Sequence, residues 1–372
     1  MQVCILSMQN VQNFGSLLQS YSLKKIIEGL GHDVSFIPIE PNEDDNSLMI
    51  GAAEDYLIES GSRDFWSRVR RVDKYFINRL HIKKLQAVQN VKFNDFRTEW
   101  LKIKAYDKEK QYDLCVIGSD EVFNCNIKST WGFTSQLFGN VHQADKVITY
   151  AASCGSTLVD NVSKLVRERI EEAFERISVF SVRDENTKKF VYKISGREPI
   201  VHLDPVVIGN FDEEIGKCQI PDYMPEYYCV VYSYYNRFNN EQDIVKIKRF
   251  CKERNLDIIS LGAPQMWIKK HVVCDPFQML KVFQYADFVI TDTFHGTIFA
   301  VKYTKRFAII LRESNRCKLM DLINRLHIRS HLIENMKQLK EVYLVENNFD
   351  YIHRIEQEEY RRTLDYLDDF IK

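Results

Sequence analysis

A short polar segment between two apolar runs is the first candidate for chemistry in this chain. In Thr291-Asp292-Thr293-Phe294-His295-Gly296, an acid, two hydroxyls and an imidazole separate the apolar residues of 288–290 from those of 297–303. The flanks are typical of a buried strand and a helix, so the polar residues fall where open α/β sheets bind ligands, beyond the carboxyl end of a strand. Because an imidazole can change its charge near neutral pH, we select His295 as the main catalytic or phosphate-contacting candidate.

The ends of other predicted strands carry similar residues. The strand at 114–117 runs into Gly118-Ser119-Asp120, and the strand at 179–182 runs into Arg183. Arginine offers bidentate contacts to phosphate or carboxylate, and unpaired N–H groups at a helix start favour the same ions. The pattern therefore predicts an anion site beyond the strand ends, with contributions from Asn13, Gly15, Ser119, Asp120, Arg183, Asp292, Gly296 and Arg312.

Structural roles for the same residues stay open at this point. Asp120 and Asp292 are suited to cap the helices that follow them, and Arg183 could pair with a neighbouring acid at a helix start. Gly15 could serve only a permissive backbone angle. The nucleotide-binding patterns GxxxxGK[ST] and GxGxxG are absent, as are HExxH and carboxylates at metal-ligand spacing. We therefore expect no cofactor and no metal.

Two blocks of alternating strands and helices must position these residues. The alternation predicts parallel sheets covered by helices, as two Rossmann-like domains with a ligand cleft between them. We place the first domain at 1–210 and the second at 211–350. A charged amphipathic helix at 351–372 follows, and it could pack back on the first domain. A stretch with two glycines and two prolines, residues 209–225, is typical of a linker.

A helical insertion interrupts the first domain at about residues 42–110. From Asp64 to Lys104 the chain is rich in Lys and Arg, with aromatic residues such as Phe65 and Trp66 at helical intervals. Its basic face is either solvated or in contact with an anionic lipid or polymer.

Composition excludes several classes of protein. The 372 residues are 45% hydrophobic with a net charge of −1, so no basic excess is available to bind nucleic acid. No secretory signal and no apolar run of about 20 residues is present. The nine scattered cysteines are typical of free thiols in a reducing compartment. We expect a cytoplasmic protein, with or without peripheral contact to the inner face of the membrane; the oligomeric state is left open.

Six segments, in order over residues 1–330, resemble the polysaccharide pyruvyl transferases. The segments are Asn13 to Tyr21, Tyr112 to Asn124, Tyr150 to Gly155, Ser181 to Asp184, Leu203 to Pro205 and Ala286 to Gly296. Glu121, Phe123 and Arg306 depart from the residues common in the family. Thr293 stands where some members carry an arginine for the donor anion, so Arg183 or Arg312 would take that contact here.

The resemblance implies a fold similar to the two-domain GT-B glycosyltransferases, with phosphoenolpyruvate as donor in the cleft. The acceptor would be a sugar of a surface glycan, such as a capsule or exopolysaccharide, or of its lipid-linked precursor. The product would be a pyruvate ketal, with release of phosphate. His295 would act in catalysis, Arg183 would clamp the donor with N–H donors at Gly296, and Asp120 would orient an acceptor hydroxyl or act as base. Ser119, Asn13 and Asp292 are second choices.

Two other functions are compatible with this architecture. One is a GT-B glycosyltransferase that uses a nucleotide-sugar, for which Glu313 is the candidate ligand of the ribose hydroxyls. The other is a non-catalytic glycan-binding protein, which would bind sugar without releasing phosphate.

Overall fold

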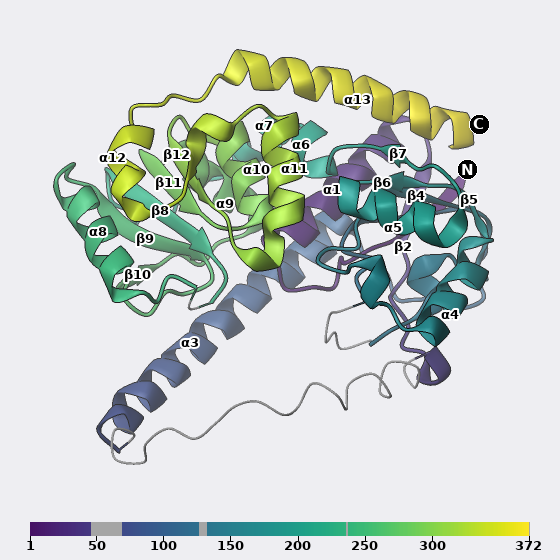
Figure 1. Ribbon diagram of the computed structural model, residues 1–372, viewed down its shortest axis with the longest axis horizontal. Coiled ribbons are helices and arrows are strands. Elements are labelled where there is room, and N and C mark those ends of the chain that lie inside the picture. The colour runs from purple at the N-terminus through teal and green to yellow at the C-terminus, as the bar shows by residue number, and fades with distance from the viewer. Residues whose placement is uncertain (46–68, 126–131, 236, 372) are drawn as a thin grey trace.

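Two parallel β-sheets, each flanked by helices, form the body of the protein (Figure 1). The computed structural model describes residues 1–45, 69–125, 132–235 and 237–371. The first sheet has the strand order β2-β1-β3-β4-β6-β7, with β5 paired to β4. Its strands are β1 (Gln2–Leu6), β2 (Asp33–Phe36), β3 (Tyr112–Asp120), β4 (Ala144–Ala152), β5 (Ile177–Val179), β6 (Ser181–Val182) and β7 (Ile200–Val201).

The second sheet is built from the C-terminal part of the chain. Its order is β10-β9-β8-β11-β12-β13, again with parallel pairing throughout. The strands are β8 (Tyr228–Ser233), β9 (Asp257–Gly262), β10 (Lys270–His271), β11 (Phe288–Thr291), β12 (Phe307–Ile310) and β13 (Leu332–Ile333). Two parallel sheets confirm the predicted α/β class with two Rossmann-like units.

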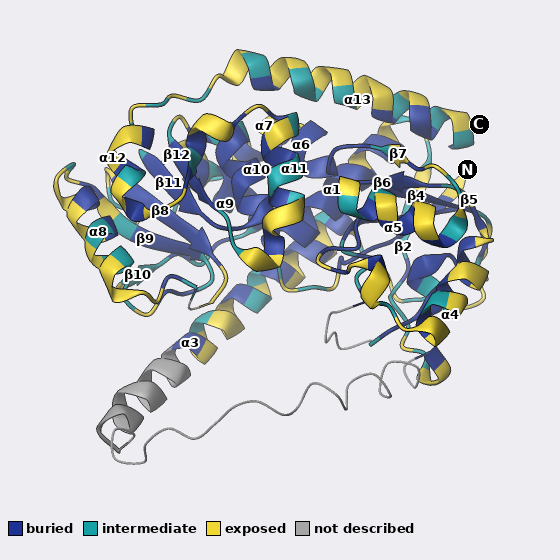
Figure 2. Cartoon of the chain, in the orientation of Figure 1, coloured by how far each residue is buried: buried dark blue, intermediate teal, exposed yellow. Residues whose placement is uncertain are grey.

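Helices cover the faces of both sheets, as parallel strands require. Central strands such as β3 and β8 are accordingly buried along almost their whole length, as Figure 2 shows for β8. The helices that precede the second sheet are α1 (Phe14–Gly29), α3 (Val69–Phe96), α4 (Lys164–Phe174), α5 (Glu185–Ser195), α6 (Pro205–Ile208) and α7 (Asp212–Lys217). The remaining helices are α8 (Glu241–Lys252), α9 (Pro276–Gln284), α10 (Phe294–Tyr303), α11 (Arg316–Arg325), α12 (Leu339–Val342) and α13 (Phe349–Ile371).

The C-terminal part of α3 connects the two sheets. Phe93 and Phe96 are buried in one apolar cluster that contains residues from both halves of the chain. Phe96 contacts Phe277 of α9 at a ring-centroid distance of 5.1 Å, and Gln89 donates a hydrogen bond to the carbonyl of Cys274. The end of the predicted insertion is therefore core rather than a solvated or lipid-facing surface. Residues 46–68, which include Phe65 and Trp66, lie outside the described residues.

The C-terminal helix α13 runs along both halves of the molecule (Figure 1). Near its start, Glu356 pairs with Lys302 of α10 at 2.7 Å. Near its end, the Tyr366 hydroxyl donates to the Thr149 carbonyl of β4 at 2.7 Å. Its outer face is largely exposed (Figure 2). Within the described residues, neither this helix nor any other has a stretch long and apolar enough to cross a membrane.

Candidate functional site

The carboxyl ends of the two sheets meet around a small cavity. The cavity has a volume of about 100 Å³, and it is lined from the first half of the chain by Asn13, Phe14 and Phe93. Tyr232, Ser233, Thr293 and His295 line it from the second half. The loops that sequence analysis selected after β1 and β11 therefore face each other, although they are separated by about 280 positions along the chain.

His295 lies directly against the start of α1. A Cβ atom added at Gly15 would lie only 2.1 Å from the His295 Nδ1 atom, so any larger side chain there would displace the imidazole. Gly15 is thus required by close packing across the two halves of the molecule, and its own N–H group is bonded to the Asn13 side chain at 2.7 Å. The opposite nitrogen of the ring, Nε2, lies 3.4 Å from Oδ2 of Asp204.

Asp204 is the buried carboxylate around which the first-domain site residues gather. It begins α6, where its Oδ1 atom accepts the N–H of Val206 at 3.0 Å. Its Oδ2 atom lies 2.8 Å from Nη1 of Arg183 and accepts the Ser119 hydroxyl at 3.3 Å. Burial alone would raise the pKa of Asp204, but His295 and Arg183 overcome this and hold it well below its ordinary value. The group is therefore an anion that can orient an imidazole and stabilise its protonated form.

Arg183 is almost fully buried, as a cation facing both Asp204 and Asp120. Its Nη1 atom lies 3.7 Å from Oδ1 of Asp120, and its guanidinium carbon lies 4.2 Å from the centre of the Phe294 ring. Burial works to lower the pKa of Arg183, yet the surrounding carboxylates raise it. The alternative pairing with Asp184 is not the one observed, because Asp184 caps α5 and accepts from Ser153 at 2.7 Å.

Asp120 has an unusual backbone conformation at the end of β3. Its φ angle is +77°, in the left-handed region that non-glycine residues seldom adopt. The side chain does not cap a helix; its Oδ2 atom accepts the hydroxyl of Ser16, in the first turn of α1, at 2.6 Å. Residues held in such conformations concentrate at functional sites, and the hydrogen bond fixes the Asp120 carboxylate next to Arg183.

The junction between β11 and α10 corrects the predicted division of roles. Thr293 is the residue that caps α10, through a hydrogen bond of 3.0 Å from the Gly296 N–H to its hydroxyl. Asp292 does not cap this helix; its carboxylate bonds to Ser233 and Arg312 instead. Because the Gly296 N–H is already bonded, it is not available to a bound anion in this structure. Gly296 is required by packing, since a Cβ there would lie 2.5 Å from the Tyr232 ring.

Asp292 belongs to a second group of charged residues, on the C-terminal side of the cleft. Its carboxylate accepts the Ser233 hydroxyl at 2.6 Å and Nε of Arg312 at 2.9 Å. A second guanidinium, that of Arg237, lies 4.0 Å away and packs on the Tyr234 ring. Arg312 is thus engaged by Asp292, whereas among the residues that the structure describes the Arg237 guanidinium donates a hydrogen bond only to Ser314, at 3.3 Å.

An ion pair joins the two halves of the chain beside the site. Glu121 follows Asp120 at the end of the first sheet, and Lys318 of α11 bonds to its carboxylate. Burial would raise the pKa of Glu121, but Lys318 lowers it to about 2. The departure from the family pattern at Glu121 therefore coincides with a contact between the two sheets.

Some functional candidates were missed by reasoning from the sequence. Asp204 was part of a quoted motif, but nothing in its neighbourhood on the chain indicated that it would join Arg183, Ser119 and His295. Arg237 and Lys318 lie in an irregular loop and on an ordinary helix, and neither carries a local signal. Their roles depend on contacts with residues 55 or more positions away.

Unpaired nitrogen atoms mark this region as suited to an anion. Among the residues that the structure describes, five buried side-chain nitrogen or oxygen atoms lack a hydrogen bond, and three of them lie here. They are Nε of Arg183, Nη1 of Arg237 and Nε2 of His295. Buried donors without a partner are costly, so a bound anionic group that accepted their hydrogen bonds would be stabilised.

Comparisons with known proteins support one family. Residues 13–315 match a family model described as polysaccharide pyruvyl transferase. No curated protein matches the chain. Among solved structures, a Methanocaldococcus jannaschii UDP-GlcNAc 2-epimerase is similar at 12% identity and a TM-score of 0.48, over 98% of this chain and 100% of that one. Arabidopsis thaliana UGT89C1 complexed with UDP-L-rhamnose is similar at 11% identity and a TM-score of 0.49, over 98% and 97%.

Proposed function

Because this chain belongs to the polysaccharide pyruvyl transferase family, we propose that it transfers the pyruvate unit of phosphoenolpyruvate to hydroxyls of a sugar in a surface glycan or its lipid-linked precursor. The product is a pyruvate ketal, and inorganic phosphate is released. The observation that carries the donor assignment is the set of unpaired cationic and imidazole nitrogens at the cleft. A donor with about three negative charges requires such groups.

The reaction needs a proton at one carbon and a nucleophile at the next. Protonation of C3 of phosphoenolpyruvate gives an oxocarbenium-like centre at C2, which a sugar hydroxyl attacks. Departure of phosphate and attack by a second hydroxyl close the ketal ring. The two sugar hydroxyls lose two protons. One balances the proton added to C3, and the other is carried by the released phosphate.

The geometry supports a separate role for each residue. Nδ1 of His295 is closely packed against Gly15, so Nε2, which lacks a hydrogen bond and lies 3.4 Å from the Asp204 carboxylate, is the nitrogen that would exchange a proton with substrate. Arg183, and with it Arg237, would hold the phosphate or carboxylate of the donor. Asp120, fixed by Ser16, would orient an acceptor hydroxyl or accept its proton. Thr293, Ser119 and Asn13 would shape the pocket rather than bind charge.

Phosphate release tests this assignment directly. We expect His295→Ala and Arg183→Ala each to reduce acceptor- and phosphoenolpyruvate-dependent phosphate release by roughly 10²- to 10⁴-fold. Arg254→Ala is a matched control, because this arginine packs on Phe250 and Tyr343 away from the cleft. Mass spectrometry of the acceptor would identify the ketal by the added pyruvate unit.

Three outcomes would contradict the proposal. If both variants retain full phosphate release, His295 and Arg183 do not act on the donor. If calorimetry detects a UDP- or GDP-sugar but not phosphoenolpyruvate, the protein is a glycosyltransferase. Sugar binding without phosphate release from any acceptor would instead indicate a non-catalytic glycan-binding protein.

A further inference from the structure

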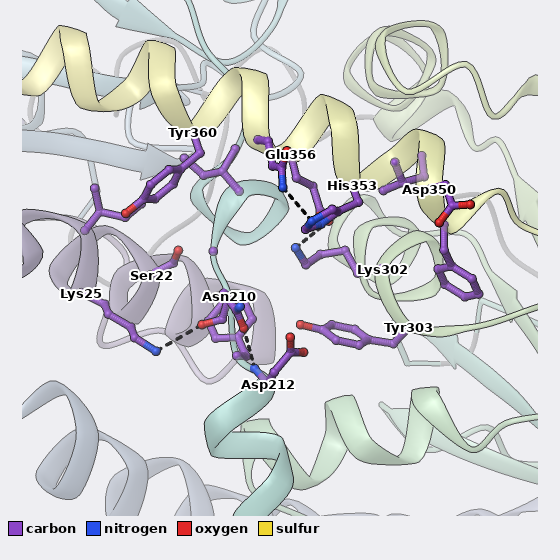
Figure 3. Close-up of a pocket in the computed structure, with 17 residues that line it drawn as sticks. Ser22, Lys25, Asn210, Asp212, Lys302, Tyr303, Asp350, His353, Glu356 and Tyr360 are labelled. Atoms are coloured by element: carbon purple, nitrogen blue, oxygen red, sulfur yellow. Dashed lines mark hydrogen bonds and ion pairs between the residues drawn. The ribbon is translucent and has the colours of Figure 1, made fainter.

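A second and larger cavity lies at the far ends of the two helices that begin at the cleft. Its volume is about 520 Å³, within the range of small-molecule sites. Figure 3 shows Ser22 and Lys25 of α1, Lys302 and Tyr303 of α10 and Tyr360 of α13 around it. At 1.5 Å per residue, Lys25 is roughly 16 Å along α1 from Phe14, and Tyr303 is roughly 12 Å along α10 from His295. The cavity is therefore separate from the candidate active site.

The lysines of this cavity are already neutralised. Lys25 pairs with Glu214 at 2.6 Å and also donates to the Asn210 carbonyl. Lys302 pairs with Glu356 at 2.7 Å and donates to the Val207 carbonyl at 2.6 Å. Neither ammonium group is left over for an anionic ligand, so a second molecule of phosphoenolpyruvate is a poor fit.

Among the described residues, the groups that line this cavity without an ion pair include carboxylates, hydroxyls and aromatic rings. Within the described part of the chain, no ion pair engages Asp212 or Asp350, both of which line the cavity. The Tyr303 hydroxyl points toward the Asp212 carboxylate, and Tyr360 closes the opposite side (Figure 3). Burial, followed by the charges of Asp212 and nearby glutamates, raises the pKa of Tyr303, so its hydroxyl remains a hydrogen-bond donor.

We propose that this cavity between α1, α10 and α13 is a binding site for an uncharged saccharide unit. Carboxylates accept hydrogen bonds from sugar hydroxyls, and the apolar face of a sugar ring packs on aromatic side chains such as Tyr303 and Tyr360. The site is too far from His295 to hold the reacting hydroxyl. This inference rests on the proposed function: the cavity would hold a different sugar of the same glycan acceptor. The enzyme would then favour an extended acceptor over a single sugar.

Saturation-transfer NMR on the 372-residue chain would test the site with defined probes. The neutral probes are methyl β-galactoside, methyl α-mannoside and N-acetylglucosamine, and the charged comparison is spermidine. We expect at least one neutral probe to bind, and Tyr360→Ala or Asp350→Asn to weaken its binding roughly tenfold through loss of one ring contact or hydrogen bond. Tyr360 is 37% exposed, so its removal leaves the core intact. Tyr192→Ala, an exposed tyrosine on α5, is the matched control.

The outcomes separate this site from the active site. Absence of binding by every neutral probe would overturn the proposal, as would spermidine binding that depends on Tyr360. Saccharide binding that is lost in His295→Ala but kept in Tyr360→Ala would place the sugar in the cleft alone and also overturn it. If saccharide binding depends on Tyr360 while the wild type releases no phosphate, the proposed function fails and the second site stands.

Discussion

At the scale of single residues, the candidate site depends on which charges are paired and which are not. Asp204 engages Arg183 and Ser119 and lies within 3.4 Å of His295. Arg312 is engaged by Asp292. Within the described part of the chain, Arg237 has no close carboxylate partner of this kind, and its Nη1 atom is buried without a hydrogen bond. A donor anion that accepted a hydrogen bond from this atom would therefore gain more binding free energy than one that had to displace Asp292 from Arg312.

Replacement of Arg237 tests this argument. We expect Arg237→Gln to raise the KM for phosphoenolpyruvate by roughly 10- to 100-fold, the effect of losing one charge-assisted hydrogen bond, while kcat changes only a few-fold. Steady-state phosphate release measured against donor concentration gives both constants. Arg249→Gln serves as control, because Arg249 pairs with Glu253 on an exposed helix surface. An unchanged KM in Arg237→Gln would remove this arginine from the donor site.

At the scale of elements, the starts of α1 and α10 form one unit. Asn13 caps α1 and Thr293 caps α10, and each cap accepts one backbone N–H of its helix start. What remains for substrate is the space between the helices, and its shape is set by the absence of a side chain at Gly15. The same two helices reach the second cavity at their far ends, so their spacing influences both sites.

A methyl group at Gly15 should uncouple activity from folding. We expect Gly15→Ala to lower phosphate release by about 10²-fold, because the new Cβ would occupy the place of the imidazole and move it from its position against Asp204. Circular dichroism should still report a folded protein, since alanine favours a helix. Gly29→Ala, at the other end of α1, is the control: nothing lies within 4 Å of the added methyl. Full activity in Gly15→Ala would show that the position of His295 does not matter.

At the scale of the whole molecule, connections of different kinds hold the two sheets in one arrangement. The end of α3 fills the apolar interior between them. Helix α13 contacts α10 through Glu356 and β4 through Tyr366. The ion pair between Glu121 and Lys318 crosses the cleft next to Asp120. The third is a partly buried ion pair beside the candidate site, and its contribution to stability depends on pH.

The low pKa of Glu121 predicts how stability depends on pH. A carboxyl whose pKa falls from 4.5 to about 2 on folding stabilises the native state at pH values above 4.5 and loses this contribution as pH falls toward 2. We expect Glu121→Gln to lower the free energy of unfolding at neutral pH by up to about 3 kcal/mol. The difference in free energy of unfolding between Glu121→Gln and the wild type should become smaller as the pH falls below 4.5, the ordinary pKa of a glutamate.

Denaturant unfolding from neutral pH down to about pH 3 would measure this gap. Glu213→Gln is the matched control, because Glu213 pairs with Lys217 on the surface and a small difference is expected at every pH. A constant gap between Glu121→Gln and the wild type across this range would contradict the assignment of a depressed pKa to Glu121.

Local patterns in the sequence were enough to predict the class of fold and to select candidate site residues. Apolar runs at strand spacing and helices at 3.6-residue spacing are local properties, and parallel strands place whatever follows them at one edge. For this reason His295, Asp120, Arg183, Ser119 and Gly15 could be selected before their neighbours were known. The six segments that resemble the pyruvyl transferases are local as well, and the family assignment followed from them.

The partner of each polar side chain could not be predicted in this way, because it depends on how distant segments pack. Whether Thr293 or Asp292 caps α10 depends on where Ser233 and Arg312 lie, and the pairing of Lys318 with Glu121 joins residues 197 positions apart. Such contacts arise from how the two sheets pack on α1, α3 and α13, and no local pattern encodes them. That packing also produces the contacts of Asp204, the unpaired nitrogen of Arg237 and the second cavity. The role of a charged side chain depends on its neighbours, and these come together only when the chain folds.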